Sequence, residues 1–173
     1  MKIMEWYQNI NQKIRTIIFI LTLIVIGLVI GKVVGIASSS YLLENIERPY
    51  DPHMPPSFEL SEDQKQSIIT GYTNVAMILC VEISLLLGLI YVFLQTYRQT
   101  KSRYLIGFLL FVGVFFVKTV SYFLAMTPLI TSSVRAAPIA IDPLFRGIFG
   151  PFGVYFKLFE IIAISILIYI SRE

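Results

Sequence analysis

The chain has a single cysteine, Cys80, and a single histidine, His53, in 173 residues. One cysteine excludes an intrachain disulfide, a CxxC redox pair and a cysteine-based zinc site. One histidine excludes a haem held by two histidines of the same chain, and no set of further ligands for copper or zinc accompanies it. We therefore expect no metal and no cofactor, with Cys80 as a small packing residue and His53 in a solvated loop.

Charge is also scarce, because Asp, Glu, Lys and Arg make up only 14% of the residues and apolar types make up 56%. Soluble domains carry about a quarter charged residues, so the composition indicates a membrane protein. The formal net charge of +3 is modest. The basic residues stand at the ends of apolar runs and form no stripe, so we expect the lipid bilayer as a partner and no nucleic acid.

Catalytic motifs are missing as well. The serines and threonines form no nucleophile elbow and have no histidine near them. Gly147, Gly150 and Gly153 surround Pro151. This spacing suits a bent helix entrance more than a phosphate loop, because no lysine follows in the P-loop position. We therefore expect no catalytic residue, no nucleotide site and no enzyme activity.

Long apolar runs dominate what is present. Each run reaches the ~20 residues that a membrane-spanning helix needs, and none alternates like a barrel strand. The first run is too long for the apolar core of a signal peptide, about 7 to 15 residues. The sequence predicts one all-α membrane domain, 1–173, folded as a four-helix transmembrane bundle. The predicted spans are 14–36, 70–95, 104–126 and 148–170, and the predicted outer loops are 37–69 and 127–147.

The charges flanking these runs predict the orientation. Basic residues precede the first run and crowd the turn between the second and third runs: Lys2, Lys13, Arg15, Arg98, Lys101 and Arg103. Segments of this kind lie in the cytoplasm by the positive-inside rule. Acidic residues prevail between the first and second runs. We therefore expect a multi-pass protein of the cell membrane with both termini in the cytoplasm.

The two predicted outer loops differ in kind. The first contains four prolines between Arg48 and Pro56, which favour extended backbone. Ser61 and Gln64 then have capping-box spacing, so the second helix should begin before the membrane. The second loop, 127–147, is unusually apolar. It needs cover from its own helices, the outer leaflet or a partner chain.

Four charged residues fall inside the second, third and fourth apolar runs: Glu82, Lys118, Lys157 and Glu160. Lys32, near the far end of the first run, can extend along its own stem toward the far surface. An isolated charge at the bilayer centre costs at least about 2.5 to 3.5 kcal/mol, so we expect Lys118 to pair with one or both glutamates inside the bundle. The cluster is either a static ion pair that fixes how the helices meet or a proton or ion site. Lys157 stands one turn before Glu160 and can pair with it, which would make the cluster neutral.

The first run carries Gly27, Gly31 and Gly35 at four-residue spacing. Glycines spaced in this way line one face of a helix and allow another backbone to approach closely. The face should therefore be a packing interface, either within the chain or against a second protomer or a partner membrane protein.

The second half of the chain, from about Leu89 to Glu173, carries several short matching features. These are Tyr97-Arg98 and Ser102-Arg103 at the turn, Gly107-Phe108-Leu109-Leu110 at the start of a helix, Phe159-Glu160, and Tyr169-Ile170-Ser171-Arg172. In these features the sequence resembles short, uncharacterised archaeal membrane proteins with several helices. The resemblance implies a membrane bundle and no particular activity.

Three functions are consistent with these observations. The first is a non-catalytic subunit or accessory protein of a larger membrane assembly, held by the first helix and the 127–147 loop. The second is a homo-oligomeric proton- or cation-coupled small transporter that uses Glu82, Lys118 and Glu160. The third is a membrane-embedded sensor module.

Overall fold

The computed structural model describes residues 2–47, 62–126 and 151–172, and every secondary-structure element in these ranges is an α-helix. The helices are α1 (Lys2–Glu47), α2 (Glu62–Thr100), α3 (Arg103–Met126) and α6 (Pro151–Ser171). The prediction of an all-α fold is confirmed for the described residues. The predicted outer loop 127–147 lies outside them.

All four helices contain a segment that is long and apolar enough to cross a membrane. The segments are Lys13–Ser40, Lys65–Thr100, Arg103–Leu124 and Gly153–Ser171. Each of the four predicted spans overlaps one of them. The last helix begins at Pro151, a residue well suited to the first helical position because its missing N–H would have no intrahelical partner there.

The first predicted loop, 37–69, is helical at both ends, and the start of α2 at Glu62 agrees with the capping-box spacing of Ser61 and Gln64. Residues 37–47 continue α1, which is 46 residues long, and residues 62–69 open α2, which is 39 residues long. The reason is that a helix does not end where hydropathy falls, since leucine and glutamate continue it well until proline interrupts it. Glu62 and Asp63 occupy the first turn of α2, where negative charge complements the helix dipole.

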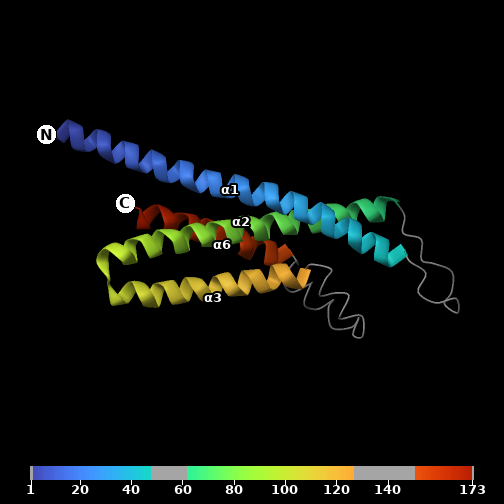
Figure 1. Cartoon of the computed structure of the whole chain (residues 1–173). Coiled ribbons are helices and arrows are strands. Elements are labelled where there is room, and N and C mark those ends of the chain that lie inside the picture. The colour runs from blue at the N-terminus through green and yellow to red at the C-terminus, as the bar shows by residue number, and fades with distance from the viewer. Residues whose placement is uncertain (1, 48–61, 127–150, 173) are drawn as a thin grey trace.

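Helix α2 is the centre of the molecule (Figure 1). Of its most apolar window 56% is buried, against 11% for each of the other three spans. Helices α1, α3 and α6 all pack against α2, whereas α3 and α6 make few contacts with each other. The buried apolar core follows from this arrangement and is drawn mainly from α2: Val81, Leu85, Leu86, Leu89, Phe93, Val112, Ile164 and Ile168.

The turn between α2 and α3 consists of Lys101 and Ser102. Lys101 adopts a left-handed backbone conformation, with φ of 50°, and its N–H donates to the Tyr97 carbonyl at 2.8 Å. This bond satisfies one of the carbonyls left unpaired at the end of α2. The Leu105 N–H then donates to the Ser102 carbonyl at 3.2 Å and opens α3. The tight turn makes α2 and α3 antiparallel neighbours.

Candidate functional site

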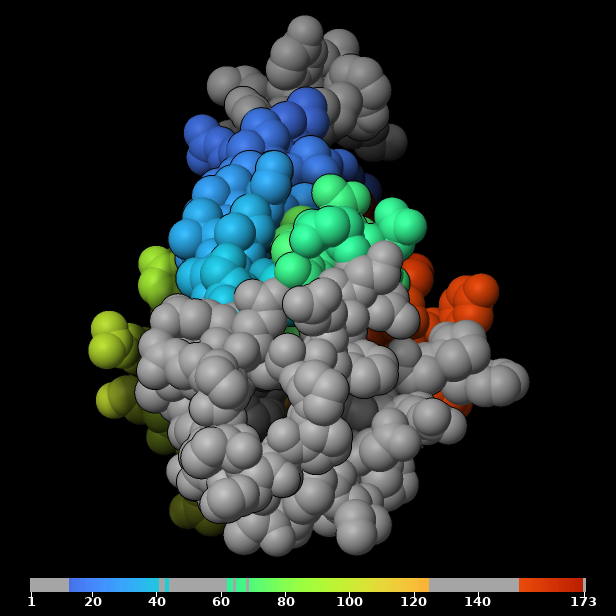
Figure 2. All heavy atoms as spheres, turned by 90° about the vertical axis from the view of Figure 1, so that its right-hand side faces the viewer, coloured from blue at the N-terminus to red at the C-terminus, as the bar shows by residue number. Residues whose placement is uncertain are grey.

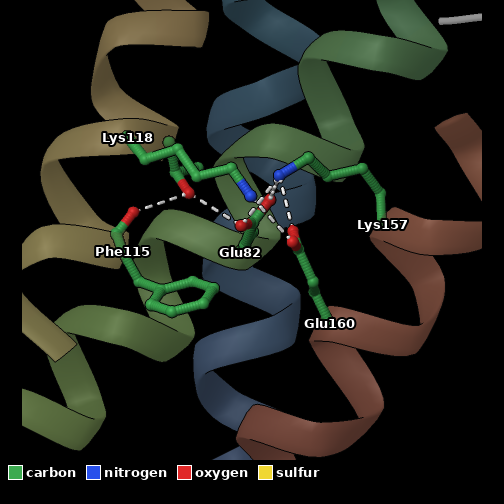
Figure 3. A network of polar contacts seen from close by, with 6 residues as sticks. Glu82, Phe115, Lys118, Lys157 and Glu160 are labelled. Atoms are coloured by element: carbon green, nitrogen blue, oxygen red, sulfur yellow. Dashed lines mark hydrogen bonds and ion pairs between the residues drawn. The ribbon is translucent and has the colours of Figure 1, made fainter. Parts of the chain in front are cut away.

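The four charged residues from the apolar runs meet in one network that links α2, α3 and α6 (Figure 3). Lys157 lies at its centre. Its Nζ donates to Glu82 Oε1 at 3.0 Å, to Glu82 Oε2 at 2.8 Å and to Glu160 Oε2 at 2.7 Å. An ammonium group has three N–H donors, so the donors of Lys157 are fully used.

Lys118 completes the network from α3. Its Nζ donates to Glu160 Oε1 at 2.9 Å, and it lies 5.3 Å from the centroid of the Phe115 ring and 5.9 Å from that of Tyr122. Aromatic faces attract a cation at such distances. The sequence predicted that Lys118 would pair with one or both glutamates. In the structure it pairs with Glu160, while Glu82 pairs with Lys157.

Glu82 receives one further hydrogen bond, from a residue that the sequence reasoning missed. The Thr119 hydroxyl oxygen lies 2.7 Å from Glu82 Oε1 and 3.1 Å from the carbonyl oxygen of Phe115. Because both neighbours accept and a hydroxyl carries one proton, we place the proton on the shorter contact, to the charged oxygen. Threonine is common in apolar helices, so nothing in the pattern distinguished Thr119 before its partner was known.

Burial decreases across the network from α2 to α3. The side chain of Glu82 is 0% exposed and that of Lys157 is 9% exposed. The side chain of Glu160 is 23% exposed and that of Lys118 is 39% exposed. Two positive and two negative charges balance, which offsets the cost of removing each charge from water. Two of the three N–H donors of Lys118 have no acceptor among the described residues, so Lys118 is the least satisfied part of the network.

Local helix geometry explains how these side chains reach one another. Lys157 and Glu160 are three residues apart on α6 and therefore lie on the same face, one turn from each other. That face is turned toward Glu82, in the middle of α2. The neighbours Lys118 and Thr119 on α3 reach different carboxylates, Glu160 and Glu82.

A groove of about 310 Å³ adjoins the network between α3 and α6. It exists because both helices pack on α2 and make few contacts with each other. Its walls are apolar apart from Glu160, which forms one end: Leu86, Leu89, Phe111, Val112, Phe115, Ala163, Ile164, Ile166 and Leu167 complete the lining. A volume near 300 Å³ lies at the lower end of the range for ligand cavities, and bundles of helices often hold such sites between them.

The glycine face of α1 lies against α2. A Cβ added to Gly27 would stand 2.5 Å from the Cα of Val81, and one added to Gly35 would stand 2.7 Å from the Cα of Thr73. At Gly31 the added atom would overlap the Cα of Met77. The close approach of these two helices is visible end-on, where light-blue α1 lies against the green start of α2 (Figure 2). Of the two alternatives left open by the sequence, the structure shows the contact within the chain.

No candidate metal centre accompanies these features in the part of the chain that the structure describes. It contains no group of three or more His, Cys, Asp or Glu side chains that could hold a metal ion. Cys80 is buried in α2. His53 lies outside the described residues. The titratable groups that the network itself contains are two carboxylates and two ammonium groups.

Comparison with known proteins identifies a family. No curated protein and no solved structure matched the chain. The model of a family of unknown function, DUF8036, matches residues 72–172. The match covers more than half of the chain and contains all four charged residues of the network, whereas α1 lies outside it. The chain belongs to the DUF8036 family.

Proposed function

We propose that this chain is a multi-pass protein of the cell membrane and serves as a non-catalytic subunit or accessory protein of a larger membrane assembly. Four helices with the length and apolarity of membrane spans support the first part. The start of α1, the α2–α3 turn and the end of α6 lie at one end of the molecule (Figure 1). Because basic residues gather there, the arrangement favours placing that end, with both termini, in the cytoplasm.

One observation carries the proposed role. The four ionisable side chains of the network neutralise one another, and three of them, Glu82, Lys157 and Glu160, are bonded on every charged oxygen or N–H. Such a network fixes how α2, α3 and α6 meet and leaves no buried carboxylate without a counter-charge. Transport or relay sites require a group that changes its proton or ion during the cycle. The network supports a structural role more directly.

The contact with a partner would use the outward side of α1, because α2 occupies its glycine face. Val25, Val29 and Val33 repeat every fourth residue on that side and are all exposed. In lipid, a face of β-branched residues gives a neighbouring helix a regular surface against which to pack. The 127–147 loop, which was also predicted to meet a partner, lies outside the described residues.

Native extraction in a mild detergent tests this role. A chain tagged at its own locus should co-purify with other membrane proteins in fixed stoichiometry. Replacing Val29 and Val33 with tryptophan should release the co-purified proteins. The control variants Val114→Trp and Val117→Trp, at exposed positions of α3, should not release them. Recovery of the wild-type chain alone, as a clean monomer, would overturn the proposal.

A second candidate, a homo-oligomeric proton- or cation-coupled transporter using Glu82, Lys118 and Glu160, is favoured by one observation. Glu160 is partly exposed and forms the end wall of the groove, so one carboxylate of the network can be approached from outside the core. In proteoliposomes the parent protein should then carry a flux that Glu160→Gln abolishes while helical content is retained. A parent protein without flux would exclude this candidate.

A further inference from the structure

The ion network is incomplete at Lys118, the bonding partner of Glu160 at the end of the groove between α3 and α6. Lys118 Nζ has three N–H donors, and its one hydrogen-bond acceptor among the described residues is Glu160 Oε1. Its other two N–H groups have no oxygen acceptor among the described residues, and the rings of Phe115 and Tyr122 lie 5.3 and 5.9 Å from Nζ. At membrane depth, such donors are costly unless an oxygen accepts from them.

The groove begins where Lys118 is anchored. Glu160, its partner, and Phe115, whose ring faces its Nζ, both line the groove. From Glu160 and Phe115 the lining continues along α3 to Phe111 and along α6 to Leu167. Both helices run there toward the end of the molecule that carries the α2–α3 turn (Figure 1). The groove thus has a polar end at Glu160, to which Lys118 is bonded, and apolar walls that run from it along the helix axes.

The distance of Lys118 from the nearer end of α3 suits contact with the headgroup of a lipid. Lys118 lies eight residues before the end of α3 at Met126, which is about 12 Å at 1.5 Å per residue. A lysine stem can carry its ammonium further toward the nearer membrane surface. Headgroup oxygens lie at that surface, and hydrocarbon chains run inward from it.

We propose that this groove binds one acyl chain of a membrane phospholipid, with a phosphate or ester oxygen accepting hydrogen bonds from Lys118. A hydrocarbon chain suits the apolar walls, and the oxygen-rich head supplies the acceptor that Lys118 lacks. A helix of a second copy would fit less well, because its apolar side chains would cover Lys118 without accepting from it. The inference rests on the proposed membrane location and not on the proposed role, since a lipid can occupy the site in a subunit or in a transporter.

Photolabelling in nanodiscs tests the inference. The full chain is reconstituted in phosphatidylglycerol containing a small fraction of the same lipid with a diazirine midway along one acyl chain. Mass spectrometry of the labelled peptides should place most label on the groove residues Phe111, Phe115 and Ala163. The equally apolar Val117 and Ile162, on the outward sides of α3 and α6, should carry several-fold less. Label that follows exposure alone would overturn the inference.

Two variants and their controls sharpen the test. Ala163→Trp should fill the groove and remove most of its label, whereas Ile162→Trp, on the neighbouring exposed position, should leave it unchanged. Lys118→Met should lower the label in the groove several-fold, whereas Lys32→Met, which removes an exposed lysine of α1, should not. Groove residues that cross-link to a second copy and take up no lipid label would also contradict the proposal.

Discussion

Two interfaces hold this protein together by different means. Helix α1 meets α2 through glycines, at distances where an added methyl group would collide with the opposite backbone. Helices α3 and α6 meet α2 through apolar packing and a network of four charges. The family match covers residues 72–172, which include the second interface and leave out α1. The contrast separates a charge-linked unit of three helices from a helix attached by close fit.

In the proposed membrane setting, burial of apolar surface from water cannot drive helices together, and the two interfaces show two other ways for helices to associate. Close backbone contact increases van der Waals attraction and needs only small residues. Ion pairs are directional, and losing one partner leaves a charge in a medium that solvates it poorly. We therefore expect the charged interface to fail abruptly when one charge is removed and the glycine interface to respond to side-chain size.

The largest effect is expected at the centre of the network. Lys157→Met leaves Glu82 and Glu160 facing each other with only Lys118 to balance them. Removing one partner of a buried ion pair costs about 3 to 5 kcal/mol, so the free energy of unfolding should fall by that order. Circular dichroism during SDS titration of mixed micelles measures it.

The matched control is Lys32→Met, which removes an exposed lysine of α1. It should change the unfolding free energy much less. Equal losses in the two variants would mean that the charges do not hold α2, α3 and α6 together.

The next effect concerns the glycine interface. Gly31→Ala places a methyl group on the backbone of Met77, and α1 must move away from α2 to accept it. Overpacking of this kind costs about 1 to 3 kcal/mol. The same titration should show the loss, and cysteine cross-linking between α1 and α2 should become slower.

Gly71→Ala is the control within α2, because an added Cβ there meets nothing within 4 Å. Alanine is the better helix former by up to about 1 kcal/mol, so this variant should be neutral or more stable. A stable Gly31→Ala protein with unchanged cross-linking would show that the close approach is not essential.

The sequence predicted the four helices, the charged residues of the network and the glycines of the α1 packing face. Length, apolarity and lone charges in apolar runs are local properties that can be read from the sequence. It could not assign partners. Lys157 was expected to pair with Glu160 on α6, but its additional contacts with Glu82 depend on how α6 is rotated against α2. The groove could not be predicted from the sequence, because it depends on how α3 and α6 both pack against α2 while making few contacts with each other.

The smallest effect is expected at Thr119. Thr119→Val keeps the shape of the side chain and removes the hydrogen bond to Glu82. Hydrogen bonds between membrane helices contribute about 0.6 kcal/mol on average and up to about 1.7 kcal/mol. Thr119→Ser, which keeps the hydroxyl, should retain most of that stability. A loss as large as that of Lys157→Met would mean that packing at this position outweighs the hydrogen bond.

The central claim is that Glu82 and Lys157 act as a pair within a neutral network, and a double-mutant cycle tests it most directly. Glu82→Gln and Lys157→Met should each destabilise the protein. The double variant should lose less than the sum of the two, because it leaves Lys118 and Glu160 as a balanced pair. Coupling energies between interacting residues are about 0.5 to 3 kcal/mol, and we predict a value within that range. Strictly additive losses would contradict the account.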